Sequence, residues 1–201
     1  MDIAGIILAG GLGTRMGYVK KAFMEINGTT VLDRLLSVYE SVFDEILIAA
    51  RDREDFRHID LPVARDRFEA RSSLTGIHAG LAEMRAEYGF FAACDAPFVQ
   101  AGLVERLCTE VTPDVDVVIP LKEDGYREPL CAVYSKRCLP HIEAQLNREN
   151  FRIIDFFDQV TVREVPVARL RDGDPDQVSF FNVNSPDDLR QAERLARELA
   201  V

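Results

Sequence analysis

Long apolar runs, paired cysteines and an excess of basic residues are all missing from this 201-residue sequence. No stretch approaches the roughly 18 consecutive apolar residues that a membrane-spanning helix needs, so we expect no membrane partner. The four cysteines form neither a C-x-x-C pair nor the spacing of a zinc site. The first residues show neither the cationic segment nor the small-residue cleavage site of a secretion signal, so we expect none. We therefore expect a soluble, cytoplasmic protein with reduced thiols.

The charge balance argues against another class of partner. Lys and Arg together number 24, Asp and Glu number 34, and the formal net charge is −10. A nonspecific grip on nucleic acid or on an anionic membrane would meet general repulsion. We expect no nucleic acid partner, and any phosphate-bearing ligand must be held by a local group of cations.

The composition that is present is that of a folded domain. The chain is 47% hydrophobic and 29% charged, and a chain of this length can bury about 70% of the surface that it exposes when unfolded. Apolar runs rich in β-branched residues alternate with segments of helical periodicity, which predicts an α/β fold on a mostly parallel sheet. We expect one doubly wound domain over residues 1–201, because no linker or internal repeat divides it.

The same patterns place the individual elements. A turn signal at Asp124-Gly125 predicts a hairpin or an antiparallel edge in an otherwise parallel sheet. Ser185 and Pro186 are suited to begin the last helix, as its cap and its first residue. Strands are expected at residues 3–8, 46–48, 62–64, 90–93, 115–121, 129–134 and 160–167, and helices at 31–42, 74–84, 102–108, 140–146 and 187–199.

The segment from Leu8 to Gly17, L-A-G-G-L-G-T-R-M-G, directly follows the first expected strand. Glycines at this point let backbone N–H groups turn toward a bound phosphate. The spacing fits neither the dinucleotide fingerprint nor a P-loop. Arg15 and the pair Lys20-Lys21 add cations that can balance the charge of a triphosphate as it is cleaved. The alternative interpretation is a tight strand-to-helix turn with surface cations.

Asp95 ends a central strand, at the edge of the sheet where open α/β proteins bind their ligands. Magnesium accepts one or two carboxylates together with phosphate oxygens, so a single aspartate facing a triphosphate is chemically sufficient. The alternative is that Asp95 only caps the turn before Pro97.

Four motifs follow one another along nearly the whole chain. They are the glycine segment with Lys21, Cys94-Asp95-Ala96-Pro97, Arg127-Glu128-Pro129-Leu130, and F-N-V-N-S-P-D-D-L from Phe181 to Leu189. The glycine segment is shared with nucleotidyltransferases in general, whereas C-D-x-P and N-x-N-[ST]-P-[DE]-[DE]-L are more particular. Together the four motifs resemble those of the molybdenum cofactor guanylyltransferases.

The resemblance implies a Rossmann-like nucleotidyltransferase fold and an enzyme that needs Mg²⁺. It would transfer GMP from GTP to molybdopterin and release pyrophosphate, with transient contacts to other proteins of cofactor biosynthesis and to the molybdoenzymes that accept the product. The implied site residues are Leu8, Ala9, Gly10 and Gly11 at the guanine and ribose, Arg15 and Lys21 as catalytic phosphate-binding cations, Asp66 at the nucleotide, Asp95 as the catalytic magnesium ligand, and Asn182 and Asn184 on the molybdopterin side.

Several positions depart from the family pattern. Ala49 stands where many members have asparagine, and the missing contact could pass to the backbone or to Arg51. The G-P-L-A-G box is present only as Ser72-Ser73-Leu74-Thr75-Gly76, which leaves the base and ribose pocket undefined. Lys20 replaces a residue that is often acidic, and either pyrophosphate binding or simple solvation would explain it.

Three other functions stay open at this point. One is the transfer of CMP from CTP to molybdopterin, which makes the cytosine dinucleotide cofactor. Another is nucleotidyl transfer to a sugar phosphate. The third is a nucleotide-binding carrier without turnover, although a mere binder would have little use for Arg15, Lys21 and Asp95 together.

The histidines and cysteines suggest no other chemistry. His58, His78 and His141 are far apart and lie in no metal-binding pattern, so we interpret them as surface or helix-packing residues. Cys94 has no activating histidine nearby in the sequence and is interpreted as a small buried hydrophobic residue rather than a nucleophile.

Overall fold

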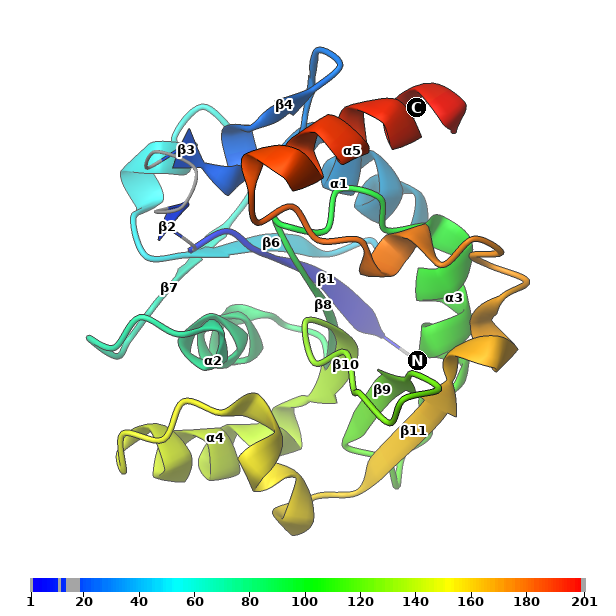
Figure 1. Ribbon diagram of the computed structural model, residues 1–201. Coiled ribbons are helices and arrows are strands. Elements are labelled where there is room, and N and C mark those ends of the chain that lie inside the picture. The colour runs from blue at the N-terminus through cyan, green and yellow to red at the C-terminus, as the bar shows by residue number, and fades with distance from the viewer. Residues whose placement is uncertain (1, 11, 14–18, 200–201) are drawn as a thin grey trace.

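A computed structural model describes residues 2–10, 12–13 and 19–199 of the chain. Its centre is a seven-stranded sheet (Figure 1). The strands are β1 (Ile3–Leu8), β6 (Ile46–Ala50), β7 (Val63–Arg65), β8 (Tyr88–Ala93), β9 (Val117–Leu121), β10 (Cys131–Ser135) and β11 (Val162–Pro166).

The strand order across this sheet is β11-β9-β10-β8-β1-β6-β7. Every neighbouring pair is parallel except the two pairs that involve β10. The mostly parallel sheet and the antiparallel pair across the Asp124-Gly125 turn are thus confirmed. The antiparallel strand lies inside the sheet, between β8 and β9, and not at an edge.

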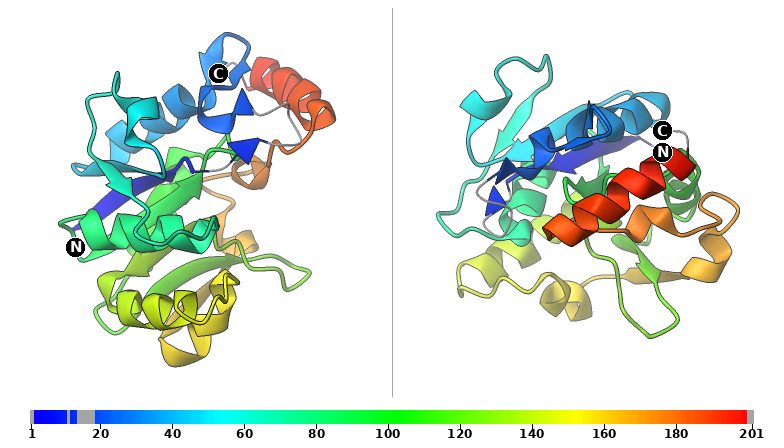
Figure 2. Two further views of the ribbon diagram at one scale, coloured as in Figure 1. Left: turned by 90° about the vertical axis from the view of Figure 1, so that its left-hand side faces the viewer. Right: turned by 45° about the horizontal axis from the view of Figure 1, so that its top comes forward.

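Helices cover both faces of the sheet (Figures 1 and 2). Residues alternate along each strand, so Ile7 packs into one hydrophobic core while Ile6 and Leu8 pack into the other. The first core includes α1 (Val31–Val42), α3 (Ala101–Thr109) and α5 (Pro186–Glu198), and the second includes α2 (Ser73–Glu83) and α4 (Leu139–Leu146). None of the described helices is long and apolar enough to cross a membrane.

The predicted cap begins α5 and fixes where the helix starts. Ser185 Oγ accepts from the Asp188 backbone N–H (3.2 Å), and Asp188 Oδ2 accepts in return from the Ser185 N–H (2.8 Å). This reciprocal pair is a capping box, with Pro186 at the first helical position. Ala192 and Ala196 are the buried residues of the helix.

Two small antiparallel sheets lie outside the main one, and the sequence patterns did not predict them. They pair β2 (Leu12–Gly13) with β3 (Val19–Lys20), and β4 (Glu25–Ile26) with β5 (Thr29–Thr30). Helix α5 packs beside β4 (Figure 2), where Asn27 Nδ2 donates to the Glu193 carbonyl at 2.9 Å. The C-terminal helix therefore lies against the segment that follows Lys21.

Candidate active site

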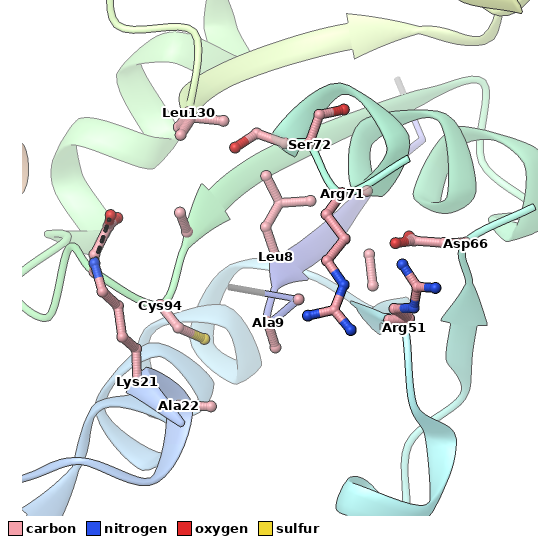
Figure 3. A pocket seen from close by; sticks show the side chains of 16 residues that line it. Leu8, Ala9, Lys21, Ala22, Arg51, Asp66, Arg71, Ser72, Cys94 and Leu130 are labelled. Carbon is pink, nitrogen blue, oxygen red and sulfur yellow. Dashed lines mark hydrogen bonds and ion pairs between the residues drawn. The ribbon is translucent and has the colours of Figure 1, made fainter. Parts of the chain in front are cut away.

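A cavity of about 310 Å³ opens at the carboxyl ends of four parallel strands and the start of α2 (Figure 3). It lies around β1, on whose two sides the sheet grows in opposite directions, the usual ligand position in open α/β folds. Its lining comprises Leu8, Ala9 and Gly10 at the end of β1 and just after it, Lys21 and Ala22, Ala49 and Arg51 at the end of β6 and just after it, Asp66 after β7, Arg71, Ser72, Ser73 and Gly76 around the start of α2, Ala93, Cys94 and Asp95 at the end of β8 and just after it, and Leu130.

One end of the cavity joins a cation, a carboxylate and an amide from distant parts of the chain. Lys21 Nζ lies 3.3 Å from Asp95 Oδ2 and donates to Asn184 Oδ1 at 2.6 Å. The side chains of Lys21 and Asp95 are only 17% and 24% exposed. Their ion pair is therefore partly shielded from water, which strengthens the electrostatic effect of either charge on a bound ligand.

Short backbone connections hold this group in place. Lys21 begins a 3-10 turn, Lys21–Phe23, whose Ala22 is buried. The Val183 N–H donates to the Asp95 carbonyl at 2.7 Å, so the segment before α5 is joined directly to the end of β8. The Asn184 N–H donates to Asp188 Oδ2 at 2.9 Å.

That hydrogen bond also affects the Asp188 carboxylate. The pKa of Asp188 lies below its ordinary value because the backbone N–H of Asn184 donates to the ionised form, with Ser185 adding to the effect. The charge of Asp188 therefore helps to hold Asn184 next to Lys21.

The opposite end of the cavity brings Arg51, Asp66 and Arg71 together (Figure 3). Burial raises the pKa of the Asp66 carboxyl, while the Thr75 hydroxyl, 3.5 Å from Oδ2, and the charge of Arg51 act in the other direction. Arg51 donates to the Glu69 carbonyl at 2.9 Å. Arg71 points into the cavity beside Arg51 and Asp66.

The first turn of α2 closes this end. Ser72 Oγ accepts from the Thr75 N–H at 3.2 Å and caps the helix. A Cβ on Gly76 would lie 3.1 Å from Leu8 Cδ2, so glycine lets the helix approach the end of β1 closely. The partial positive charge of a helix N-terminus favours an electron-rich ligand here.

Most of the residues singled out from the sequence meet at this cavity. Leu8, Ala9, Gly10, Lys21, Asp66 and Asp95 line it, and Asn184 joins it through Lys21. Asn182 is exposed, and its side chain has no hydrogen-bond partner among residues 2–10, 12–13 and 19–199. Gly11 and Arg15 lie outside the described residues.

Arg71 is a charged cavity residue that the sequence patterns missed. It stands immediately before the Ser72-Ser73 pair, in the stretch that departs from the family box. A basic residue next to the start of a ligand-facing helix was the signal available. Arg51, named as a substitute for the asparagine missing at position 49, does line the cavity.

Cys94 and His78 have structural roles, as predicted. Cys94 is buried, and burial raises the pKa of its thiol far above the ordinary range, so it is not an activated nucleophile. His78 is buried on α2, lies 2.9 Å from Glu143 Oε1 on α4, and packs edge-on against Phe68.

The donor set around Asp95 suits a cation that brings ligands of its own. In the described part of the chain, no three His, Cys, Asp or Glu side chains are grouped to hold a metal. Asp95 lines the cavity, and its Oδ2 contacts Lys21. Because Mg²⁺ is commonly bound by one or two carboxylates plus phosphate oxygens and water, Asp95 fits magnesium arriving with a triphosphate.

Known proteins are similar to this chain in both sequence and fold. A protein from Desulfosudis oleivorans, described as a molybdenum cofactor guanylyltransferase, is 41% identical over 191 residues, which cover 95% of this chain and 94% of its own. A relative from Natranaerobius thermophilus is 36% identical over 198 residues and 96% of each chain. The crystal structure of molybdopterin-guanine dinucleotide biosynthesis protein A from Archaeoglobus fulgidus matches with a TM-score of 0.87 at 28% identity, covering 97% of this chain and 99% of that one.

The family model for the MobA-like NTP transferase domain matches residues 5–163. This range contains the glycine segment, Lys21, Asp66 and Asp95, and the resemblance seen in the motifs is confirmed. The chain belongs to the MobA-like NTP transferase family.

Proposed function

We propose that this protein is a molybdenum cofactor guanylyltransferase, with residues 1–201 forming a single transferase domain. It transfers GMP from GTP to molybdopterin and releases pyrophosphate. The observation that carries the proposal is the Lys21–Asp95 pair, 3.3 Å apart, in one cavity with the glycine-rich end of β1. The 41% identical relative has the same described activity.

The reaction requires positioning more than proton transfer. An oxygen of the terminal phosphate of molybdopterin is already charged at neutral pH, so it can attack the α-phosphorus of GTP without a strong base. One P–O bond forms, the bond from the α-phosphorus to the oxygen bridging to the β-phosphorus breaks, and pyrophosphate leaves with that electron pair. Holding the two phosphates in line is the main task of the protein.

Lys21 and Asp95 take different parts in that task. The Lys21 ammonium has three donors, and Asp95 and Asn184 use only two of them, so a donor remains for a phosphate oxygen. Lys21, together with Arg15, would offset the repulsion between the molybdopterin phosphate and the triphosphate of GTP, which must approach each other. When bound, Mg²⁺ would be held by Asp95 and would polarise the phosphate oxygens as a Lewis acid.

The remaining contacts follow the shape of the cavity. Leu8, Ala9 and Gly10 would lie along the ribose and base, with Asp66 at the far end. The family resemblance alone adds Gly11 to this group. Asn182 and Asn184 would face molybdopterin, because Asn184 lies beside Lys21, on the side of the cavity away from Asp66.

Two further parts of the proposal concern the setting. Cys94, Cys108, Cys131 and Cys138 are free thiols, which suits the reducing cytoplasm. Transient contacts with proteins that supply molybdopterin, and with the molybdoenzymes that receive the product, are expected because such a cofactor must be handed on.

The test mixes purified protein with Mg²⁺, molybdopterin and each nucleoside triphosphate in turn, and measures pyrophosphate and the dinucleotide product. Product with GTP is expected. Product with CTP alone would make the enzyme a cytidylyltransferase, and binding without product would make it a carrier. Omitting Mg²⁺ in a parallel sample should abolish turnover.

A further inference from the structure

The end of the cavity formed by Arg51, Asp66 and Arg71 carries charges that the transfer step does not use. The triphosphate of the proposed reaction belongs at Lys21 and Asp95, and the chain from Leu8 to Gly10 runs between the two ends. Because one nucleotide spans the cavity, its base lies at the second end. The assignment of the base to this end therefore rests on the proposed function.

The two arginines at this end differ in what they already bind. Arg51 donates to the Glu69 carbonyl at 2.9 Å, and its charge acts on Asp66. Arg71 is exposed and points into the cavity, and across the described ranges 2–10, 12–13 and 19–199 no hydrogen bond or ion pair involves its guanidinium. Its N–H donors are therefore available to a ligand.

The pairing of a free guanidinium with a half-buried carboxylate selects among the bases. Guanine presents two N–H donors, N1–H and the 2-amino group, on one edge and two acceptors, O6 and N7, on the adjacent edge. A carboxylate matches the first pair, and an arginine fork matches the second. Adenine places an amino donor next to N7, and cytosine offers no adjoining O6 and N7 pair, so neither satisfies both groups.

We propose that Arg71 is a specificity-determining residue that donates to O6 and N7 of the guanine base, while Asp66 accepts from N1–H and the 2-amino group on the adjacent edge. Arg71 directly precedes Ser72-Ser73-Leu74-Thr75-Gly76, the segment that stands where the family has its G-P-L-A-G box. A lysine at this position would keep the charge and lose the planar fork.

The test pairs each variant with a nucleotide that lacks one acceptor. The values of kcat/KM for pyrophosphate release and the Kd by calorimetry are measured for GTP and for 7-deaza-GTP, which has a C–H in place of N7. Wild type should prefer GTP by roughly 10-fold, the effect of losing one charged hydrogen bond. That preference should disappear in Arg71→Ala and should shrink without vanishing in Arg71→Lys, whose ammonium can still donate to N7 or O6 but lacks the planar fork.

Two controls make the result specific to Arg71. Arg67→Ala removes a nearby arginine whose partner, 4.0 Å away, is Glu83 outside the cavity, and this variant should keep the wild-type preference. Inosine triphosphate, which lacks the 2-amino group, reports on the Asp66 side, and its disadvantage relative to GTP should persist in Arg71→Ala.

The proposal is overturned if Arg71→Ala discriminates against 7-deaza-GTP as strongly as wild type does. An equal loss of the 7-deaza-GTP and inosine preferences in Arg71→Ala would also count against it, because a distorted pocket would then explain both. A wild-type protein that releases no pyrophosphate from GTP would instead refute the proposed function, so the two failures are distinguishable.

Discussion

The two ends of the cavity hold their charged side chains in opposite ways. At one end Lys21 contacts both Asp95 and Asn184, and backbone hydrogen bonds fix the segments that carry them. At the other end Asp66 lies beside the guanidinium groups of Arg51 and Arg71. The Arg71 group lines the cavity and has no hydrogen-bond or ion-pair partner in the described part of the chain. The first end is organised before any ligand binds, as phosphate chemistry requires, whereas the second leaves donors for the ligand to use.

The largest effect is expected from removing the carboxylate of the organised end. Asp95→Ala should lower kcat about 1,000-fold, because it removes the one carboxylate that the described lining residues place at that end, and Lys21 loses its charged partner. Steady-state pyrophosphate release measures the effect. Near wild-type turnover in a folded Asp95→Ala protein would refute the assignment of the phosphates to this end.

Adjacent lysines give the next comparison. Lys21→Ala should lower kcat about 100-fold, the loss expected for one donor to a developing charge. Lys20 pairs with Asp55 and does not line this cavity, so Lys20→Ala should stay within about twofold of wild type, as exposed ion pairs contribute little. Equal losses in the two variants would mean that net positive charge, and not the position of Lys21, matters.

Motifs could predict the organised end because its residues belong to three separate, recognisable stretches. The strand pattern placed Asp95 at the carboxyl edge of the sheet, and Lys21 was expected beside it because it follows the glycine segment; both line the cavity. The contact between Lys21 and Asn184 was not predictable, because it depends on how α5 packs against β4. Periodicity likewise could not place β10 inside the sheet, since it carries no information about strand order.

The second end escaped prediction for a different physical reason. Its geometry depends on where Ser72 caps α2 and on how closely Gly76 lets that helix approach Leu8. Both are tertiary effects in a loop that departs from the family pattern. Arg71 enters the cavity only through that local path of the backbone.

A smaller effect should come from the cap that positions the organised end. Ser185→Ala removes the acceptor for the Asp188 N–H and should lower the free energy of unfolding by about 1 kcal/mol. Urea denaturation measures the change. Turnover should fall several-fold, because Asn184 directly precedes the cap. Unchanged turnover would show that the position of Asn184 does not depend on where the helix starts.

The smallest effect concerns pH. The folded-state pKa of Asp188 is depressed, so its carboxylate contributes stability above the unfolded-state pKa, near 3.9, and loses it as the pH falls through the folded-state value. Wild type should therefore be more stable than Asp188→Asn at pH 7, with the difference shrinking below about pH 4. Urea unfolding across this range tests the sign, and a difference independent of pH would contradict it.

A crystal structure of the protein with GTP would show directly which end of the cavity binds the triphosphate and which end binds the base. We predict the triphosphate within hydrogen-bond distance, about 3 Å, of Lys21 Nζ, and the guanine between Asp66 and Arg71. A base at the Lys21 end, or a triphosphate bound outside this cavity, would contradict the account.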